Sequence, residues 1–212
     1  MISFSLVFML KRCIVVQRYA HSHPQHFYLS VESVTFGTVM ELLEKFNHIR
    51  LLAFDLDGVL TNGKLLLSPD GEWIREMDIK DGFALQHAIR SGFHVAVITG
   101  SSSLPVRKRL EKLGIPHFYE NVHSKSQVLV KLMQEHGLEP SQVLFMGDDI
   151  PDLDAFKVTG LRCCPADAVH EVRDRADYIS HKAGGDGAVR DVIEKVLRVQ
   201  DKWLSTDGIQ SI

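Results

Sequence analysis

Five short apolar runs that alternate with helical segments constrain the fold of this chain more than any other feature. The runs occupy residues 49–54, 94–99, 117–119, 143–146 and 161–164. Between them, apolar residues recur at helical spacing in segments that stop at Gly92, Gly114 and Gly137, and a last helix is expected over about 187–199. Strands alternating with helices are typical of βαβ units. The sequence therefore predicts an α/β fold, a doubly wound parallel sheet with helices on both faces.

One segment interrupts the alternation. Lys64–Leu67 and Glu72–Met77 flank the sequence Ser-Pro-Asp-Gly, which predicts a β-hairpin over about 64–77 around a type I turn. A two-stranded hairpin standing alone is marginal in water, and this one is rich in apolar side chains. These are Leu65, Leu66, Leu67, Trp73, Ile74 and Met77. We therefore expect another copy of the chain to cover the hairpin in a homo-oligomer.

Composition excludes several classes of protein. The chain has 212 residues with 45% hydrophobic and 24% charged residues, which is ordinary for a globular domain. A net charge of −3 does not favour a nucleic-acid partner. Three cysteines, two of them adjacent, are typical of a reducing compartment, and we expect the cytoplasm.

The N-terminus is expected to form a separate, poorly ordered extension over residues 1–34, before a single domain over 35–212. Its apolar start, residues 1–10, is too short to span a bilayer, so no membrane partner is expected. The first 31 residues contain no acidic residue, which is a feature of organelle presequences and keeps an organelle open as the alternative location.

Chemically active side chains follow the strands at their carboxyl ends, where open parallel sheets bind ligands. The first strand is followed by Asp-Leu-Asp-Gly-Val-Leu-Thr (55–61), and the second by Thr99, Gly100 and Ser101. Lys125 follows the third strand, and Gly-Asp-Asp (147–149) follows the fourth. Clustered carboxylates need a cation, and oxygen ligands suit Mg²⁺. A lysine and a threonine beside them suit a phosphoryl group.

Two carboxylates in the first block have the spacing that phosphoryl chemistry needs. One can attack phosphorus, and another two residues later can carry the proton. A D-x-D-G turn also occurs in calcium loops, but those need flanking helices, and here a strand precedes Asp55. Asp148, Asp149 and Asp152 have an alternative role as caps of a helix that starts near Pro151.

The motifs resemble the haloacid dehalogenase superfamily of aspartate-nucleophile phosphatases. FDLDGVLT (54–61), ITGS (98–101), Lys125 and MGDDIPD (146–152) follow one another in the superfamily's order. The chain resembles in particular the 3-deoxy-D-manno-octulosonate 8-phosphate phosphatase family, through PADA (165–168), ADYIS (176–180) and AGGDGAVRDV (183–192). The resemblance begins at about residue 35 and implies a Rossmann-like fold with a small hairpin and no large cap domain.

The resemblance implies roles for matching residues. Asp55 corresponds to the nucleophile and a metal ligand, and Asp57 to the general acid and base, with its backbone carbonyl on the metal. Thr99 would hold a phosphoryl oxygen, and Lys125 would offset negative charge. Asp148 would bind Mg²⁺, with Asp149 in support.

Further residues are expected to bind the substrate. Arg109 and the segment of Asp78, Ile79, Lys80, Asp81 and Gly82 match sugar-acid contacts in the family, and the remaining candidates are Asp57, Gly100, Ser101 and Lys125. Arg109 would act in its own subunit or reach a neighbouring one. Its alternative role is as part of a solvated helix face together with Arg107, Lys108 and Lys112.

The function implied is Mg²⁺-dependent hydrolysis of 3-deoxy-D-manno-octulosonate 8-phosphate through an aspartyl-phosphate, in lipopolysaccharide precursor biosynthesis, by a homotetramer. The family usually has Arg after Thr-Gly and the nine-carbon group tends to have Glu there, so Ser101 matches neither. Lys112 looks more like the nine-carbon group. A 2-keto-3-deoxynononate 9-phosphate phosphatase is therefore an alternative. Another is a non-catalytic assembly module related to sialic-acid-activating enzymes, against which the intact set of catalytic residues argues.

Two glycines and two cysteines complete the candidates. Gly184 and Gly185 are either a phosphate-cradling loop or a plain turn before the last helix. Cys163 and Cys164 favour strand packing over redox chemistry.

Overall fold

A computed structural model describes residues 36–69, 71 and 73–203 of the chain. The expected N-terminal extension over 1–34 lies outside the described residues.

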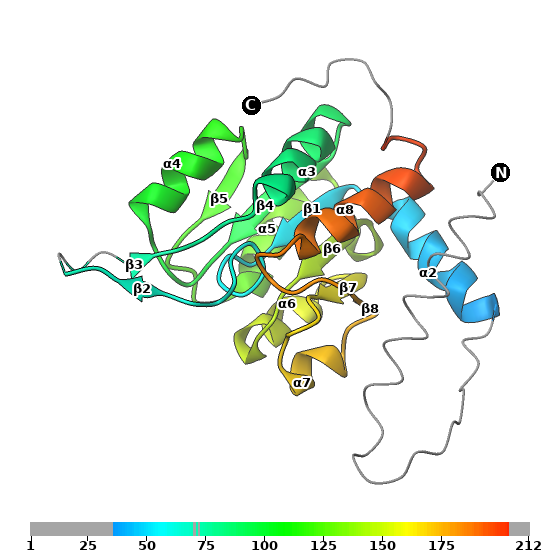
Figure 1. The fold of residues 1–212 in the computed structure, drawn as a ribbon. Coiled ribbons are helices and arrows are strands. Elements are labelled where there is room, and N and C mark those ends of the chain that lie inside the picture. Colours follow the sequence, from blue (N-terminus) through cyan, green and yellow to red (C-terminus); the bar gives the residue numbers. More distant parts are fainter. Residues whose placement is uncertain (1–35, 70, 72, 204–212) are drawn as a thin grey trace, which may run out of the picture.

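Six parallel strands form the central sheet, in the order β5-β4-β1-β6-β7-β8 (Figure 1). The strands are β1 (Leu51–Phe54), β4 (His94–Ile98), β5 (His117–Tyr119), β6 (Val143–Met146), β7 (Leu161–Cys164) and β8 (Tyr178–Ile179). β1 is buried along its whole length, and Leu51 pairs with His94 on one side and Val143 on the other. The five predicted strands and the parallel sheet are confirmed. The short edge strand β8 was not predicted.

Helices cover both faces of the sheet, as predicted. One face carries α2 (Phe36–His48), α3 (Ile79–Arg90), α4 (Leu104–Lys112) and α8 (Ala188–Val199). The other carries α5 (Lys125–His136), α6 (Leu153–Phe156) and α7 (His170–Arg173), and two 3₁₀ turns, η1 (Pro140–Gln142) and η2 (Ile150–Asp152), flank β6. None of the helices in the described ranges is long and apolar enough to cross a membrane.

Alternate residues of each strand enter different cores, because successive side chains of a strand point to opposite faces. Leu52 and Phe54 pack beneath α2, α3 and α8, whereas Leu51 and Ala53 pack against α5. This double burial explains why the central strands read as continuous apolar runs. Cys163 and Cys164 are free thiols buried in the two cores, in agreement with the packing interpretation.

The predicted hairpin consists of β2 (Leu66–Leu67) and β3 (Trp73–Ile74), which pair antiparallel. The Gly71 amide donates to the Ser68 carbonyl at 2.9 Å, which closes the turn. The turn type depends on Asp70, which lies outside the described residues. In Figure 1 the hairpin extends away from the sheet, and Leu66 and Trp73 are 66% and 55% exposed. Between β1 and α3 the described residues form no other strand or helix, so no large cap is present there.

Candidate active site

The carboxyl ends of β1, β4 and β6 place the candidate residues at one edge of the sheet. Sheet-like hydrogen bonds continue one residue past the strands, where the Asp55 amide donates to Met146 at 2.9 Å and the Thr99 amide to Tyr119 at 2.9 Å. Asp55 and Thr99 therefore leave the sheet with fixed directions. Lys125 is the first residue of α5 and reaches the same edge from the face of the sheet that α5 covers.

Lys125 lies between two carboxylates. Its ammonium is 2.7 Å from Asp55 Oδ1 and also donates to Asp152 Oδ1, and all three side chains are buried. Burial alone would lower the pKa of Lys125, but the charges of Asp55 and Asp152 outweigh it and raise that pKa. The lysine is therefore a fixed positive charge within an acidic group.

Asp152 organises the loop after β6. Its Oδ2 accepts from the amides of Asp148 at 2.8 Å and Asp149 at 3.3 Å, while its Oδ1 holds Lys125. The sequence interpretation treated Asp152 as a possible helix cap and did not include it in the site. Asp154 does cap a helix, because it accepts from the Ser126 amide at the start of α5.

The acidic group carries more negative charge than Lys125 neutralises. Burial, and then the charge of Asp152, raises the pKa of Asp55 to about 7 and that of Asp148 to about 8. Asp148 Oδ1 is buried and has no hydrogen-bond partner in the described structure. Oxygens of Asp55, Asp148 and Asp152 lie within 4.8 Å of one another. Such an all-oxygen group with a spare buried lone pair fits Mg²⁺.

Asp149 lies outside this group. Its side chain is exposed, and its Oδ1 accepts from the Ile150 amide at 2.7 Å, which caps η2. Its carboxylate therefore caps a local turn, while its charge still acts on Asp148, and its supporting role at the metal stays a prediction.

Two glycines allow the loops of the site to pack closely. Gly58 has a φ of +91°, and a Cβ there would lie 2.0 Å from Asp148 Oδ2. A Cβ on Gly184 would lie 1.9 Å from the Gly58 carbonyl oxygen. The amides of Gly184 and Gly185 are already used by Asp167 and by the Val59 carbonyl. Of the two interpretations of Gly184-Gly185, the packed turn therefore fits and the phosphate cradle does not.

Asp57 lies in a second network, which includes a residue that sequence reasoning missed. Arg75, directly after the return strand β3, pairs with Asp57 through Nε at 2.6 Å and Nη2 at 3.0 Å. Ser101 Oγ donates to Asp57 Oδ2 at 2.9 Å and lies 3.0 Å from Thr99 Oγ1. A sequence signal was available, because Arg75 is a cationic residue in an apolar hairpin and this hairpin directly follows the acidic turn that contains Asp57.

The start of α3 lies beside Arg109. A Cβ on Gly82 would be 2.8 Å from Arg109 Nη2, so the glycine makes room for the guanidinium. Asp78 caps α3 by accepting from the Lys80 amide at 2.7 Å, and Ile79 is 79% exposed. Gly82 and Arg109 are therefore neighbours, and contact of this segment with a substrate stays a prediction.

Asp81 is placed differently from the rest of this segment. Its side chain is buried, and its Oδ1 accepts from the Arg190 amide at 2.7 Å, at the start of α8. The carboxylate of Asp81 is therefore engaged in holding two helices together. Gly100, by contrast, is exposed at the edge of the site.

The comparisons with known proteins agree with this geometry. A family model of haloacid dehalogenase-like hydrolases matches residues 76–160. The 3-deoxy-D-manno-octulosonate 8-phosphate phosphatase KdsC of Salmonella typhi is 36% identical over 171 residues, which are 81% of this chain and 90% of the relative.

Solved structures are similar over most of their length. A Moraxella catarrhalis 3-deoxy-D-manno-octulosonate 8-phosphate phosphatase, in complex with magnesium, phosphate and KDO, superposes with a TM-score of 0.74 at 37% identity, covering 77% of this chain and 94% of that one. The cobalt-bound Haemophilus influenzae phosphatase YrbI gives a TM-score of 0.73 at 32% identity, covering 77% and 95%. With such similarity over most of both chains, the protein belongs to the 3-deoxy-D-manno-octulosonate 8-phosphate phosphatase family of the haloacid dehalogenase superfamily.

Proposed function

We propose that this protein hydrolyses 3-deoxy-D-manno-octulosonate 8-phosphate to the free sugar acid and inorganic phosphate. The observation that carries the proposal is the buried acidic group around Lys125, in which Asp55 stands at the end of the central strand. Asp55, Asp148 and the Asp57 backbone carbonyl would hold Mg²⁺, which supplies positive charge that neutralises the phosphoryl oxygens.

In the first step, Asp55 attacks phosphorus and the bond between phosphorus and the ester oxygen breaks. Asp57 gives its proton to the departing sugar oxygen, which leaves an aspartyl-phosphate. In the second step, Asp57 takes a proton from water, the water oxygen bonds to phosphorus, and the bond to Asp55 breaks. Lys125 offsets the charge on Asp55 and on the phosphoryl group throughout, and Thr99 holds a phosphoryl oxygen.

The eight-carbon substrate is favoured by a guanidinium beside Ser101. The family usually has Arg at that position, and the lack of it in the sequence raised the nine-carbon alternative. Arg75 Nη2 lies 3.3 Å from Ser101 Oγ, so the hairpin brings a guanidinium to this place from another element. Its Nε and Nη2 already pair with Asp57, so Arg75 supplies positive charge at this place and not a free fork for the substrate carboxylate. Arg109, beside Gly82, supplies a second positive charge.

The nine-carbon acid phosphate is the second candidate, because Ser101 itself supplies only a hydroxyl. The deciding experiment compares kcat/KM for the eight-carbon and nine-carbon acid phosphates and for a simple sugar phosphate, in Mg²⁺. We expect the eight-carbon substrate to be preferred. A preference for the nine-carbon acid would reverse the assignment, and equal values would exclude sugar-acid specificity.

The mechanism has its own test. Asp55→Asn should abolish turnover while the far-ultraviolet circular dichroism spectrum stays unchanged. Near-native Mg²⁺-dependent phosphatase activity of this variant would exclude Asp55 as the nucleophile. If the native protein hydrolyses none of the phosphate esters tested, a non-catalytic assembly module would be favoured instead.

We also propose a homotetramer whose hairpins cover neighbouring active sites. The support is the exposure of Leu66, Leu67 and Trp73, which are 66%, 68% and 55% exposed although they are apolar. Multi-angle light scattering should give four times the 23.9 kDa chain mass, and Trp73→Asp should lower it. A native protein that runs only as a 24 kDa species would contradict this proposal.

The proposed compartment is the cytoplasm, where a step of lipopolysaccharide precursor biosynthesis would take place. It rests on the odd number of cysteines and the two buried free thiols. The intact mass of the native protein tests it, because loss of a leading segment of about 20–35 residues would support the organelle alternative or a later start.

A further inference from the structure

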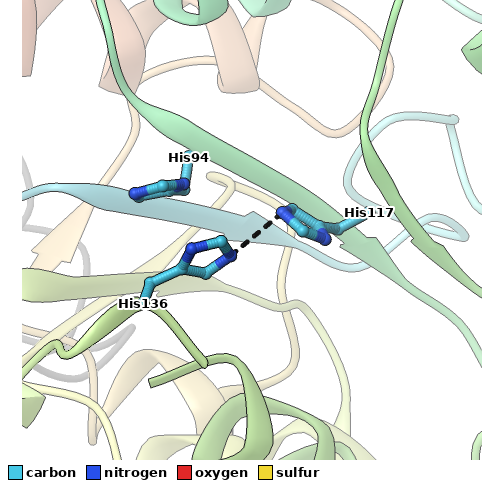
Figure 2. Close-up of side chains that lie close together, drawn as sticks. All are labelled: His94, His117 and His136. Carbon is cyan, nitrogen blue, oxygen red and sulfur yellow. Dashed lines mark hydrogen bonds between the residues drawn. The ribbon is translucent and has the colours of Figure 1, made fainter. Parts of the chain in front are cut away.

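Three histidines from three elements meet at the sheet edge opposite the candidate active site (Figure 2). His94 is the first residue of β4, His117 is the first of β5, and His136 is the last of α5. All three are half-buried. Thr99, which directly follows β4 at the active site, is five residues from His94, or roughly 16 Å at about 3.3 Å per residue. The cluster is therefore separate from the phosphatase machinery.

The rings are close enough to share one ion. His136 Nε2 lies 3.2 Å from His117 Nε2, and the ring of His94 stacks on that of His136 with centroids 3.9 Å apart. Each histidine has a ring nitrogen within 4.8 Å of a ring nitrogen of the others. Two nitrogens bound tetrahedrally to Zn²⁺ at about 2.0–2.1 Å would be separated by about 3.3 Å. The distance between His117 and His136 already matches this value, and a side-chain rotation of His94 would bring its nitrogen in.

The electrostatic surroundings keep the rings ready for a metal. Only a neutral imidazole offers a lone pair. Burial and the neighbouring His136 lower the pKa of His94, and burial with both neighbouring rings lowers the pKa of His117. Glu135, next to His136 in the chain, adds a negative charge that acts on His117. Protonated rings this close would repel one another and a cation, so the neutral rings that these shifts favour are the ones able to bind a metal.

We propose that His94, His117 and His136 form a second metal site, for Zn²⁺ or a similar borderline ion. Three imidazole ligands and an open fourth position for water are a coordination set that zinc accepts in proteins. Nitrogen donors also separate this site from the all-carboxylate group, which suits Mg²⁺. A metal here would tie the C-terminal end of α5 to the amino ends of β4 and β5. Its role would be to stabilise that corner of the fold, because the reacting groups lie at the other end of the strands.

The alternative is a simple arrangement of one hydrogen bond and one ring stack. The two are distinguished by zinc titration of the full-length protein in excess Mg²⁺, followed by calorimetry. His94→Gln, His117→Gln and His136→Gln should each lose the same one equivalent of zinc that the native protein binds. His123→Gln is the matched control, because His123 is an exposed histidine that lies outside the cluster, and this variant should keep that equivalent.

A second readout does not depend on counting ions. Zinc at about a hundredfold excess over its dissociation constant should raise the Tm of the native protein and of the His123 control by about 5–10 °C, but not that of the three variants. Co²⁺ used as a probe should give the intense visible absorption of a tetrahedral site. The proposal fails if the native protein and His136→Gln bind zinc equally, or if His94→Gln retains the equivalent. It also fails if Co²⁺ in excess Mg²⁺ gives only a weak octahedral spectrum.

Discussion

Arg75 Nε lies 2.6 Å from Asp57 Oδ1, and this contact joins the hairpin to the turn that follows β1. The Arg75 side chain is only 2% exposed, although the apolar side chains around it on the hairpin face solvent. The hairpin is therefore anchored at its base by a charge pair, while the exposed apolar side chains of β2 and β3 can meet another surface. Movement of the hairpin would therefore change the contact of Arg75 with Asp57, the proposed general acid.

Arg75→Ala should reduce kcat/KM for the sugar-acid phosphate by about ten- to a hundredfold, the usual effect of losing a charge-assisted contact of ~1.5–3 kcal/mol. Arg75→Lys should recover only part of this, because an ammonium cannot make two parallel hydrogen bonds. Lys64→Ala, on the exposed side of the same hairpin, is the matched control. If the Arg75 and Lys64 variants have the same kinetics, the contact has no functional role.

Gly184→Ala should impair the site without touching a reacting group. The new Cβ would meet the Gly58 carbonyl oxygen at 1.9 Å, so the turn that carries Asp57 has to move. We expect a loss of activity and of stability of about 1–3 kcal/mol, as for other overpacked positions. Gly92→Ala is the control, since a Cβ there meets nothing within 4 Å and only its left-handed backbone is strained. Enzyme assay and urea denaturation of both variants check this, and a fully active Gly184→Ala would show that the turn adapts.

The strand ends could be predicted because apolar runs and the motifs after them are local in sequence. Asp55, Thr99 and Lys125 lie where parallel strands had to bring them. What could not be predicted depends on side-chain geometry across elements. An Asp in a turn can either cap a helix or form an ion pair with a distant lysine, and the sequence looks the same in both cases. The pairing of Asp152 with Lys125 could therefore not be predicted.

Other omissions have different physical causes. The strand β8 is two residues long, which is too short to show a period. The helix α2 precedes the first motif, and the sequence analysis predicted no helix there. Its burial against α8 is a tertiary contact that periodicity alone does not reveal.

Asp152→Asn should be costly although Asp152 is not a proposed metal ligand. The neutral side chain can still accept from the Asp148 amide, but the charge that faces Lys125 is lost. In saturating Mg²⁺, which would offset the repulsion of Asp152 with Asp55 and Asp148, we expect a stability loss of about 1–3 kcal/mol. The loss stays below that of a fully unpaired buried charge because Lys125 keeps its contact with Asp55. Asp149→Asn, in the same turn but exposed, should be close to neutral. Equal urea midpoints for the two variants would contradict a central role for Asp152.

Asp81 should make the free energy of unfolding depend on pH. Burial raises the pKa of Asp81 to about 7, and its Oδ2 has no hydrogen-bond partner in the described structure. In the unfolded chain the same carboxyl ionises near its ordinary value of 3.8. Between these two values the folded state binds more protons than the unfolded state, so the free energy of unfolding falls as pH rises from about 4 to about 7.

Asp81→Asn removes this group while its amide oxygen can still accept from the Arg190 amide at the start of α8. The variant should therefore gain stability relative to the native protein as pH rises from 5 to 8. Asp186→Asn is the control, because it removes a carboxylate of the same kind from an exposed position in the turn before α8. Urea denaturation of the three proteins at pH 5 and pH 8 measures their free energies of unfolding. Saturating Mg²⁺ keeps the contribution of the acidic group around Lys125 the same in all three. A difference between Asp81→Asn and native protein that is the same at both pH values would mean that Asp81 stays ionised in the folded state.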